Sequence, residues 1–417
     1  MKVYLVGGAV RDILMDKEPK DLDYVVVGSS VEEMLSLGYK QVGSSFPVFL
    51  HPDTGEEYAL ARREVKDGKG YNGFTCEFGP DVTLEEDLYR RDLTINSMAM
   101  DEDETVIDPY GGWEDLDHRI LRHTSDAFME DPVRVLRVAR FVARDPSFTI
   151  HPELAERMER MRDELPDITE ERLGKETLRA LMEDHPSQYF RILTPLGVFP
   201  ELEPMVGLNE GNRWHPEKDV FEHVMLSLDS AAMWGYNLQV RYGVLCHDLG
   251  KPEAYSLTNG KKSNGHEKMG VPIANQLSRR MRVPSYLKHI GGISAEYHTH
   301  IHISLDMKPS TIAKFLKMFR SEKDLNNLIG VAKSDKRGRG GIVGDLPYVQ
   351  SYYIKNCWNV LSSIDYSGLT KKVAGEGHGS SVLIERIHSE RCKAVSNIDK
   401  ACYVEINNWA MELLNRS

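Results

Sequence analysis

The sequence is poor in cysteine and lacks any long hydrophobic run. Its five cysteines form no CxxC pair, which indicates free thiols in a reducing cytoplasm rather than a disulfide framework or a zinc knuckle. No apolar run approaches the roughly twenty residues of a transmembrane helix. The first apolar run is interrupted by the charged residues Arg11 and Asp12, whereas the apolar region of a signal peptide is continuous. We therefore expect a cytoplasmic protein with no membrane partner.

Positive charge is also scarce, with 52 Lys and Arg residues against 64 Asp and Glu residues and a net charge of −12. This balance argues against a general polyanion binder, so any nucleic-acid surface must be a local basic strip. Hydrophobic residues make up 41% of the 417 residues, which is ordinary for a globular chain with several cores. That length predicts about two to four domains.

The chain opens on a short apolar strand followed by a glycine turn. Gly7 and Gly8 allow a tight turn that presents amide groups to a phosphate, and Arg11 follows one helical turn later to meet the same anion. Asp21 and Asp23 stand two residues apart at the start of the next strand, so both carboxylates point to one face. They repel each other unless a divalent cation lies between them, which predicts a catalytic Mg²⁺ site.

Alone, a Gly-Gly pair is usually a turn and an Asp-x-Asp pair is usually a solvated loop. Their combination is more specific, because GGxVRDxL at residues 7–14 followed by DxD at 21–23 resembles the signature of the polymerase-β-type nucleotidyltransferases. That family includes tRNA nucleotidyltransferase (the CCA-adding enzyme) and bacterial poly(A) polymerase. Glu57, at the start of another expected strand, is a candidate third metal carboxylate, and a hairpin edge is the alternative.

Two further stretches match motifs of the same family. RRDLTIN at residues 90–96 resembles the family's RRDxxIN motif, which favours Arg91 as a ligand of the triphosphate over a solvated basic pair. DPYGGWEDL at residues 108–116 matches the DPxxGxxDL turn, whose proline and glycines we expect to be structural.

Residues 130–144, EDPVRVLRVARFVAR, predict a helix with arginines along one face. Cytosine and adenine both present an amino donor beside an unprotonated ring nitrogen, and uracil and guanine present the reverse. A carboxylate at Asp131 and a guanidinium at Arg134 would therefore accept C and A and reject U and G. A plain helix cap is the alternative for Asp131.

The same helix matches a family motif, EDxxRxLRxxRF. The resemblance implies a protein template for CTP and ATP, with Arg137 and Arg140 contacting the nucleotide.

A second set of candidate ligands lies further along the chain. His223 falls on an expected helix over 220–233, and the pair His247-Asp248 follows the apolar run 240–246. A lone histidine is more often a core or surface residue than a metal ligand. An adjacent His-Asp pair together with an earlier histidine and the later Asp335 is a more specific indication of a metal site. Imidazole and carboxylate together suit Mn, Fe, Co, Ni or Zn rather than Mg.

This H…HD…D pattern resembles the HD-type metal-dependent phosphohydrolases, which implies His223, His247, Asp248 and Asp335 as ligands. His266 and His298 fit the extra ligands of two-metal members, which position water for attack on a phosphate ester. Whether this second metal site is complete stays open. We expect His300 and His302 to be incidental.

One basic stretch near the late aspartate admits two interpretations. KSDKRGR at residues 333–339 is either a solvated loop or a contact for the phosphates of a substrate or tRNA. The chain after about residue 345 is expected to be helical and carries no motif.

The predicted fold class is α+β. We expect a polymerase-β-like head over 1–143 with a small, mainly antiparallel or mixed sheet, and a helical neck and body over 144–214 that binds tRNA. An all-α HD domain over 215–340 and a helical tail over 341–417 complete the prediction.

The resemblance is to the long bacterial CCA-adding enzymes that carry an HD domain. It implies addition of CCA to tRNA lacking its 3′ CCA, from CTP and ATP, by a monomer or homodimer. It also implies 2′,3′-cyclic phosphodiesterase, 2′-nucleotidase and phosphatase activity with Ni²⁺ or Mn²⁺ in the HD domain. The alternatives are a poly(A) polymerase, or an HD phosphohydrolase whose head only binds nucleotide or RNA.

Overall fold

The structure, a computed structural model, describes residues 1–42, 48–66, 74–210, 217, 219–260, 262–376 and 378–416. The chain forms two compact units, Met1–Ile168 and Thr169–Ser417. The first unit extends past residue 143, where the sequence predicted the head to end. The predicted boundary between residues 214 and 215 lies outside the described residues, and the division into four domains stays a prediction.

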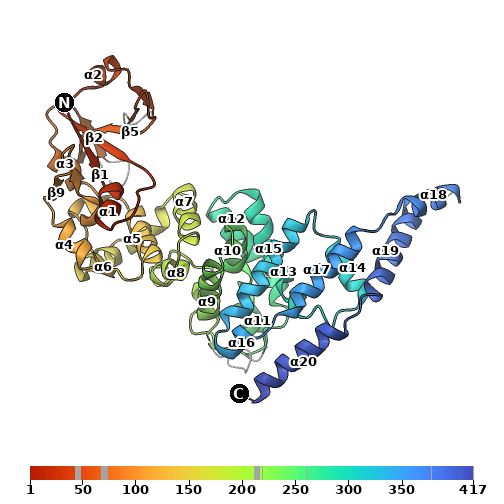
Figure 1. The fold of residues 1–417 in the computed structure, drawn as a ribbon. Helices are drawn as coiled ribbons and strands as arrows, with labels where there is room; N and C mark the ends of the chain where they lie inside the picture. Colours follow the sequence, from red (N-terminus) through yellow and green to blue (C-terminus); the bar gives the residue numbers. More distant parts are fainter. Residues whose placement is uncertain are drawn as a thin grey trace. The chain divides into compact units, whose positions relative to one another are not determined.

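A seven-stranded mixed sheet forms the centre of the first unit (Figure 1). Its strand order is β3-β4-β5-β2-β1-β8-β9, and β2 and β5 run parallel while their other neighbours are antiparallel. A separate β6–β7 hairpin and a short β10–β11 pair complete the strands. The strands are β1 Lys2–Val6, β2 Asp23–Val27, β3 Lys40–Val42, β4 Val48–Leu50, β5 Glu57–Leu60, β6 Arg62–Lys66, β7 Phe74–Phe78, β8 Ala99–Met100, β9 Val106–Ile107, β10 Ile120–Leu121 and β11 Thr149–Ile150.

Helices follow the strands in positions that the sequence signals explain. Ser30 caps α2 through its side chain, and Thr83 begins α3 with a capping box that Glu86 closes. In α5, every position except the four arginines is buried, so this helix packs on all sides but one. The helices are α1 Gly8–Leu14, α2 Val31–Ser36, α3 Leu84–Tyr89, η2 Thr94–Asn96, α4 Gly112–Asp117, η3 Asp126–Glu130, α5 Val133–Arg144, α6 Pro152–Arg160 and η4 Arg162–Asp167.

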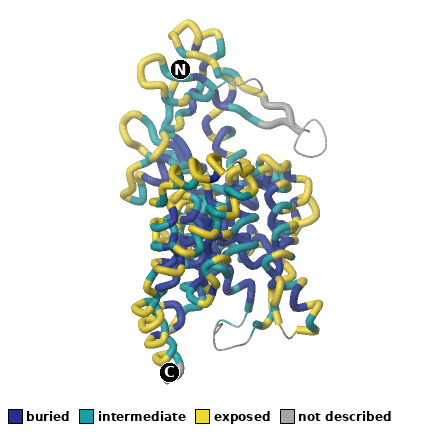
Figure 2. Tube along the Cα trace, turned by 90° about the vertical axis from the view of Figure 1, so that its right-hand side faces the viewer, coloured by how far each residue is buried: buried dark blue, intermediate teal, exposed yellow. Residues whose placement is uncertain are grey.

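The described part of the second unit contains helices and no named strand, and α9, α12, α13 and α15 pack around the short helix α10 and on one another (Figure 1). Figure 2 colours the chain by burial, with buried residues in dark blue and exposed residues in yellow. The helices are α7 Glu170–Leu181, α8 Pro186–Leu193, η5 Glu203–Met205, α9 Val220–Met233, α10 Leu238–Cys246, α11 Lys251–Leu257, α12 His266–Arg280, α13 Ser285–His302, α14 Pro309–Leu316, α15 Glu322–Gly338, α16 Gly341–Asp345, α17 Val349–Ser362, α18 Ser367–Gly375, α19 Ser380–Ser396 and α20 Ala401–Arg416.

The C-terminal helices belong to the hydrophobic core of the second unit. Side chains of α13, α14, α15 and α17 form one buried cluster, which Val395 of α19 and the flanking Tyr403 of α20 join. In the part of the chain that the structure describes, no helix combines the length and apolar character required to cross a membrane. The observed architecture confirms the predicted α+β class.

Candidate functional site

Two of the candidate carboxylate residues, Asp23 and Glu57, begin neighbouring strands at the end of the sheet where β1 turns into α1. Asp23 is the first residue of β2 and pairs in parallel register with Glu57, the first residue of β5. The antiparallel register of β1 and β2 places Asp23 opposite the last residue of β1, directly before the glycine turn. Glu57 thus lies beside Asp23 in the backbone register, on an interior strand of the sheet, and its role as a third metal ligand stays a prediction.

The charges around Asp23 fit a cation site. Loss of hydration raises the pKa of the Asp23 carboxyl, the nearby Arg91 opposes this shift, and the negative charge of Asp21 adds to it. A divalent cation would relieve this repulsion, and a set of carboxylate oxygens suits Mg²⁺. The sequence prediction of a metal at Asp21 and Asp23 is therefore compatible with the geometry, and it remains a prediction.

The glycine turn lies beneath two guanidinium groups. Gly7 has a φ of +71°, and a Cβ there would lie 2.8 Å from Nη1 of Arg91. At Gly8 an added Cβ would lie 3.5 Å from Nη2 of Arg11. Nη2 of Arg91 in turn donates to Asp87 at 3.0 Å, which orients it. The turn thus lies close to two guanidinium groups, each of which is also paired with a carboxylate, Arg11 with Asp12 and Arg91 with Asp87.

A buried network of hydrogen bonds and ion pairs joins the three sequence motifs of the head. Arg11 donates through Nη1 to Asn96 at 2.6 Å, and Asn96 donates through Nδ2 to Asp92 at 3.0 Å. Nε of Arg137 donates to Asp92 at 2.6 Å. Through these bonds the GGxVRD motif, the RRDxxIN motif and α5 hold one another in place.

Two residues predicted to bind the nucleotide, Arg11 and Arg137, form hydrogen bonds and ion pairs within the protein. Arg11 is 5% exposed, donates twice to Asp12 and lies over the ring of Phe141. Arg137 is paired with Asp92, as described above. Their contact with a nucleotide stays a prediction. Sequence reasoning missed the acceptors Asp12 and Asp92, although both stand inside the motifs.

The predicted base-selecting pair lies at the start of α5. Oδ1 of Asp131 accepts from the backbone N–H of Val133 at 3.1 Å, so the capping role is present. Arg134 is half-buried and donates to the carbonyl of Ala127 at 2.8 Å. Arg140 lies on the same half-exposed face of α5. Asp131 has an extended backbone and lies directly before α5, Arg134 lies in the first turn of α5, and their contact with a base stays a prediction.

The DPxxGxxDL turn is structural, as expected. Asp108 accepts from the N–H groups of Gly112 and Trp113 at 2.7 and 2.9 Å. A Cβ at Gly112 would lie 2.2 Å from the carbonyl oxygen of Thr94, so only glycine fits against η2.

The six predicted HD ligands meet in the second unit as two buried groups. Within each group, one ligand atom from every member lies within 4.8 Å of those of the other members. The elements that carry them are α9, the end of α10, α12, α13 and α15. The first group is His223, His247 and Asp335, and the second is Asp248, His266 and His298.

Backbone carbonyls orient three of these histidines. Nδ1 of His247, His266 and His298 lies 2.7, 2.8 and 2.9 Å from the carbonyls of Val244, Ser263 and Ser294. A carbonyl can only accept, so Nδ1 carries a proton and Nε2 is the ring atom that is left to act as a ligand. Such second partners are typical of metal-binding histidines.

Buried charge in this cluster is only partly compensated by the protein. Oδ1 of Asp248 accepts no hydrogen bond from any described residue, although the side chain is 1% exposed. Burial and the charge of His247 lower the pKa of His298 well below its usual value, so its ring is neutral. Burial opposes protonation of His223, but hydrogen bonds to Asp335 and Glu217 outweigh it and raise its pKa to about 9. Imidazoles and carboxylates in this arrangement fit a transition-metal ion.

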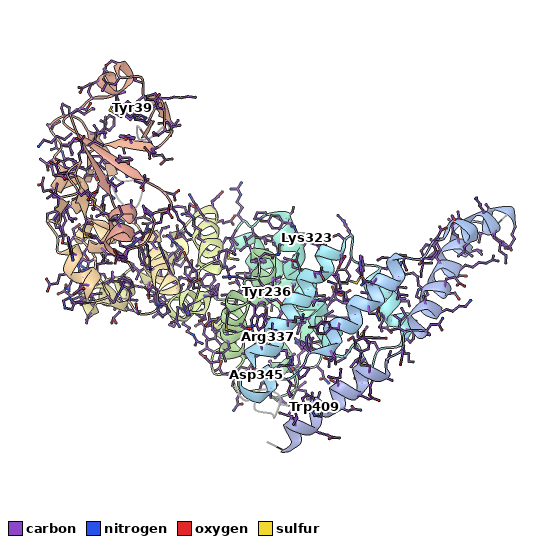
Figure 3. All side chains as sticks on the ribbon, in the orientation of Figure 1. Tyr39, Tyr236, Lys323, Arg337, Asp345 and Trp409 are labelled. Atoms are coloured by element: carbon purple, nitrogen blue, oxygen red, sulfur yellow. The ribbon has the colours of Figure 1, made fainter. Side chains whose placement is uncertain are left out.

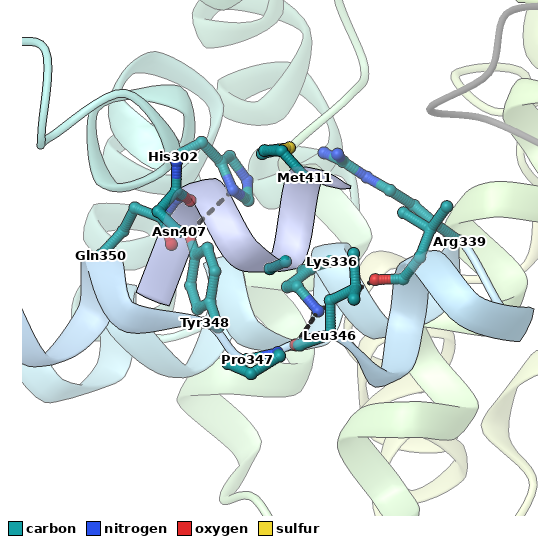
Figure 4. Close-up of a pocket in the computed structure, with 11 residues that line it drawn as sticks. His302, Lys336, Arg339, Leu346, Pro347, Tyr348, Gln350, Asn407 and Met411 are labelled. Carbon is teal, nitrogen blue, oxygen red and sulfur yellow. Dashed lines mark hydrogen bonds between the residues drawn. The ribbon is translucent and has the colours of Figure 1, made fainter. Parts of the chain in front are cut away.

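His302, which we expected to be incidental, contacts one of the candidate metal ligands. Its Nε2 lies 2.6 Å from Oδ2 of Asp335, and its Nδ1 lies 2.7 Å from the hydroxyl of Tyr348. Arg339 also donates to Asp335, at 3.2 Å. His302 and Arg339 line a cavity of about 120 Å³ beside the cluster, bounded on the far side by α20 (Figure 4). The spacing of His298 and His302, four residues apart on one helix, was the signal for this contact.

The basic stretch 333–339 is not a loop, because most of it forms the last turns of α15. Gly338 lets that helix approach α9 closely, since a Cβ there would lie 2.0 Å from Oγ of Ser227. Lys336 donates to the carbonyls of Val343 and Gly344 at 2.9 and 3.0 Å, which holds α16 against α15.

Comparison with known families and structures places this geometry in context. Residues 3–122 match the family model of the poly A polymerase head domain, and residues 147–206 match that of a probable RNA and SrmB-binding site of polymerase A. The structure of the Bacillus stearothermophilus CCA-adding enzyme in complex with CTP is similar, with 22% sequence identity and a TM-score of 0.64. That match covers 99% of this chain and 93% of that one.

Two other solved structures are similar over nearly the same length. The Thermotoga maritima CCA-adding enzyme complexed with tRNA_CCA has 18% identity and a TM-score of 0.61, covering 99% of this chain and 91% of that one. A tRNA-processing enzyme in an apo form has 22% identity and a TM-score of 0.57, covering 94% and 93%. The likeness includes the C-terminal helices, for which the sequence offered no match. The chain therefore has the fold of the CCA-adding enzymes, with a head of the poly(A) polymerase type.

Proposed function

We propose that this protein is a nucleotidyltransferase that adds CCA to the 3′ end of tRNA from CTP and ATP. The observation that carries the proposal is the buried network through Asn96 and Asp92, because it joins the glycine turn, the RRDxxIN motif and the arginine face of α5. The similarity in fold to CCA-adding enzymes supports it.

The residues of the head divide the reaction between them. Asp21 and Asp23, with Glu57 beside them, would hold Mg²⁺, which activates the attacking 3′-hydroxyl and neutralises the triphosphate. Arg91 and the amide groups of the glycine turn bind the triphosphate and the departing pyrophosphate. The hydroxyl of the tRNA attacks the α-phosphate in line, and the bond to pyrophosphate breaks.

Selection of the base is assigned to the start of α5. Asp131 accepts from the amino group of cytosine or adenine, and Arg134 donates to the adjacent ring nitrogen. Uracil and guanine would leave these groups unpaired or opposed. Arg137 and Arg140 support the nucleotide from the next turns.

Extension of a tRNA that lacks CCA tests this proposal. The wild type should add two C residues with CTP alone and one further A once ATP is present. Asp21→Asn should reduce the rate at least about 100-fold, because the metal would lose a charged ligand. Asp53→Asn, the same change in an exposed turn of the same unit, serves as the control. Long A tails would indicate a poly(A) polymerase, and near-normal addition by Asp21→Asn would refute the assignment.

We propose a second function for the other unit, because its two buried groups of ligands meet in one cluster. With Ni²⁺ or Mn²⁺ bound, the cluster would supply an activated water for hydrolysis of a phosphate ester. His223, His247 and Asp335 would hold one ion, and Asp248, His266 and His298 a second. The substrates we propose are a 2′,3′-cyclic phosphate and simple phosphomonoesters.

Hydrolysis of a nucleoside 2′,3′-cyclic phosphate with Ni²⁺ or Mn²⁺ tests this activity. His247→Ala should abolish hydrolysis and spare nucleotide addition, since the two sites belong to different units. His289→Ala, a change of an exposed histidine on α13, is the matched control. Loss of both activities in a folded His247→Ala variant would contradict two independent sites.

A further inference from the structure

A groove on the second unit combines aromatic rings with positive charge. It has a volume of about 350 Å³ and lies between the end of α9, the last turns of α15, α16 and the start of α17. We call it the aromatic–cation groove and define it by six of its residues: Trp234, Lys333, Lys336, Arg337, Asp345 and Tyr352. Figure 3 labels Arg337 and Asp345 in this region.

Two cations of α15 each stand over a ring from another helix. The guanidinium carbon of Arg337 lies 3.7 Å from the ring centre of Trp234, and Nζ of Lys333 lies 5.1 Å from that of Tyr352. The rings stay open to solvent nonetheless, with Trp234 55% and Tyr352 63% exposed. Large aromatic side chains exposed next to fixed cations offer stacking surfaces with charge beside them.

The positive charge in the groove is only partly balanced. Nη1 of Arg337 is buried and meets no hydrogen-bond acceptor among the described residues. Burial lowers the pKa of Lys333, and the nearby charges of Arg337 and Lys355 lower it further. Asp345 is the one carboxylate that lines the groove among the described residues, and Lys336 is occupied with backbone carbonyls. On a chain with a net charge of −12, this is the local basic strip that binding of a polyanion requires.

We propose that the aromatic–cation groove binds single-stranded RNA, with a base stacked on Tyr352 or Trp234 and its phosphate held by Arg337 and Lys333. Stacking and cations together recognise a single strand without reading its sequence. The inference rests on the proposed function only in taking RNA as the partner. The groove also shares Lys336 and Tyr348 with the cavity beside the HD cluster, so a strand bound here would lie along the wall of that cavity.

Binding of a fluorescent 12-nucleotide single-stranded RNA to the full chain tests the groove. Arg337→Gln should weaken binding about 3- to 10-fold and reduce the dependence on salt by about one counterion, because one phosphate contact is lost. Tyr352→Ala should weaken binding about 10-fold through lost stacking, with little change in the salt dependence.

Two matched variants complete the design. Lys323→Gln removes the same charge near the other end of α15, and Tyr286→Ala removes a tyrosine that is 49% exposed on α13; both should bind RNA as the wild type does. Wild-type affinity in Arg337→Gln and Tyr352→Ala would overturn the proposal, as would equal losses in all four variants. Extension of tRNA by the wild-type protein is measured separately. If the wild type extends tRNA but the groove variants bind RNA as tightly as the wild type, only the groove proposal is refuted. If the wild type binds RNA through the groove but does not extend tRNA, only the proposed CCA addition is refuted.

Discussion

Asp92 is the single residue on which the ion network of the head depends. It is 7% exposed and accepts from Arg137 and Asn96, so its charge is compensated entirely by the protein. Burial alone would raise the pKa of Asp92, but the charge of Arg137 and the hydrogen bonds from Asn96 and Arg137 outweigh it. They hold this pKa well below its usual value.

Asp92→Asn should destabilise the protein by about 2 kcal/mol, because it removes the buried carboxylate that accepts hydrogen bonds from Arg137 and Asn96. The measurement is urea unfolding followed by circular dichroism. Asp103→Asn, a change of an exposed aspartate in a turn of the same unit, should shift stability by less than about 0.5 kcal/mol. Equal stability of the Asp92→Asn variant and the wild type would show that the network is not stabilising.

The same residue makes stability depend on pH in a defined direction. The pKa of Asp92 is lower in the folded than in the unfolded protein, so its ionisation stabilises the fold above the unfolded value of 3.8. This contribution is lost as the pH falls toward the folded pKa. The difference in unfolding free energy between wild type and Asp92→Asn should therefore shrink between about pH 5 and pH 3. A constant difference over that range would contradict the depressed pKa.

Glu57 gives a second prediction for a single residue. Its register with Asp23 predicts that Glu57→Gln slows nucleotide addition about 10- to 100-fold without unfolding the head. Glu56→Gln is the control, because Glu56 precedes β5 and its carboxylate accepts a hydrogen bond from the hydroxyl of Thr54. The check is the rate of CTP incorporation at saturating Mg²⁺. Equal rates for the two variants would limit the metal site to Asp21 and Asp23.

At the level of elements, glycines set how closely the helices of the second unit approach. A Cβ at Gly250 would lie 2.0 Å from the carbonyl oxygen of His266 and 2.4 Å from the backbone nitrogen of Gly270. Gly250 follows Asp248 by two residues, and His266 begins α12. The contact between the start of α11 and the start of α12 therefore fixes where two of the candidate ligands meet.

Gly250→Ala should destabilise the protein by about 1–3 kcal/mol, because neither backbone can yield to the added methyl group. It should also weaken binding of Ni²⁺, since His266 is displaced with α12. Gly292→Ala on α13 is the control, because a Cβ there meets no atom within 4 Å. That change should stabilise by up to about 1 kcal/mol through helix propensity. Thermal unfolding and metal titration check both, and unchanged Ni²⁺ affinity in Gly250→Ala would contradict the coupling.

At the level of the whole molecule, the two candidate sites belong to different compact units. The carboxylates at residues 21, 23 and 57 lie in Met1–Ile168, and the two buried groups of candidate metal ligands lie in Thr169–Ser417. The ligand types differ as well, with oxygen donors in the first and imidazole with carboxylate in the second.

Hydrogen exchange with and without Ni²⁺ should reveal this separation. Binding of Ni²⁺ should protect the amides of α9, α12, α13 and α15, because the ion ties these helices together. The His247→Ala variant should lose this protection, whereas exchange in the first unit should not differ between the two proteins. Protection in wild type that persists in His247→Ala would move the ion to another site.

The sequence by itself determined the fold class, and it identified the candidate metal carboxylates of the first unit and most of the candidate ligands of the second. Asp21 and Asp23, the glycine turn and His247-Asp248 are neighbours in the chain, so local spacing was sufficient to predict their shared direction. Helix boundaries also followed from local signals, as at Ser30 and over 220–233, where caps and periodicity act within one turn.

Only the tertiary structure decided which distant residues complete these sites. The register of β2 and β5 brought Glu57 to Asp23, and helix packing brought His302 to Asp335 and the cations of α15 to Trp234 and Tyr352. These contacts depend on strand register and on glycines that admit close approach between helices, as Gly338 does against Ser227. Neither property is encoded in the spacing of a single motif, because each depends on two segments far apart in the chain.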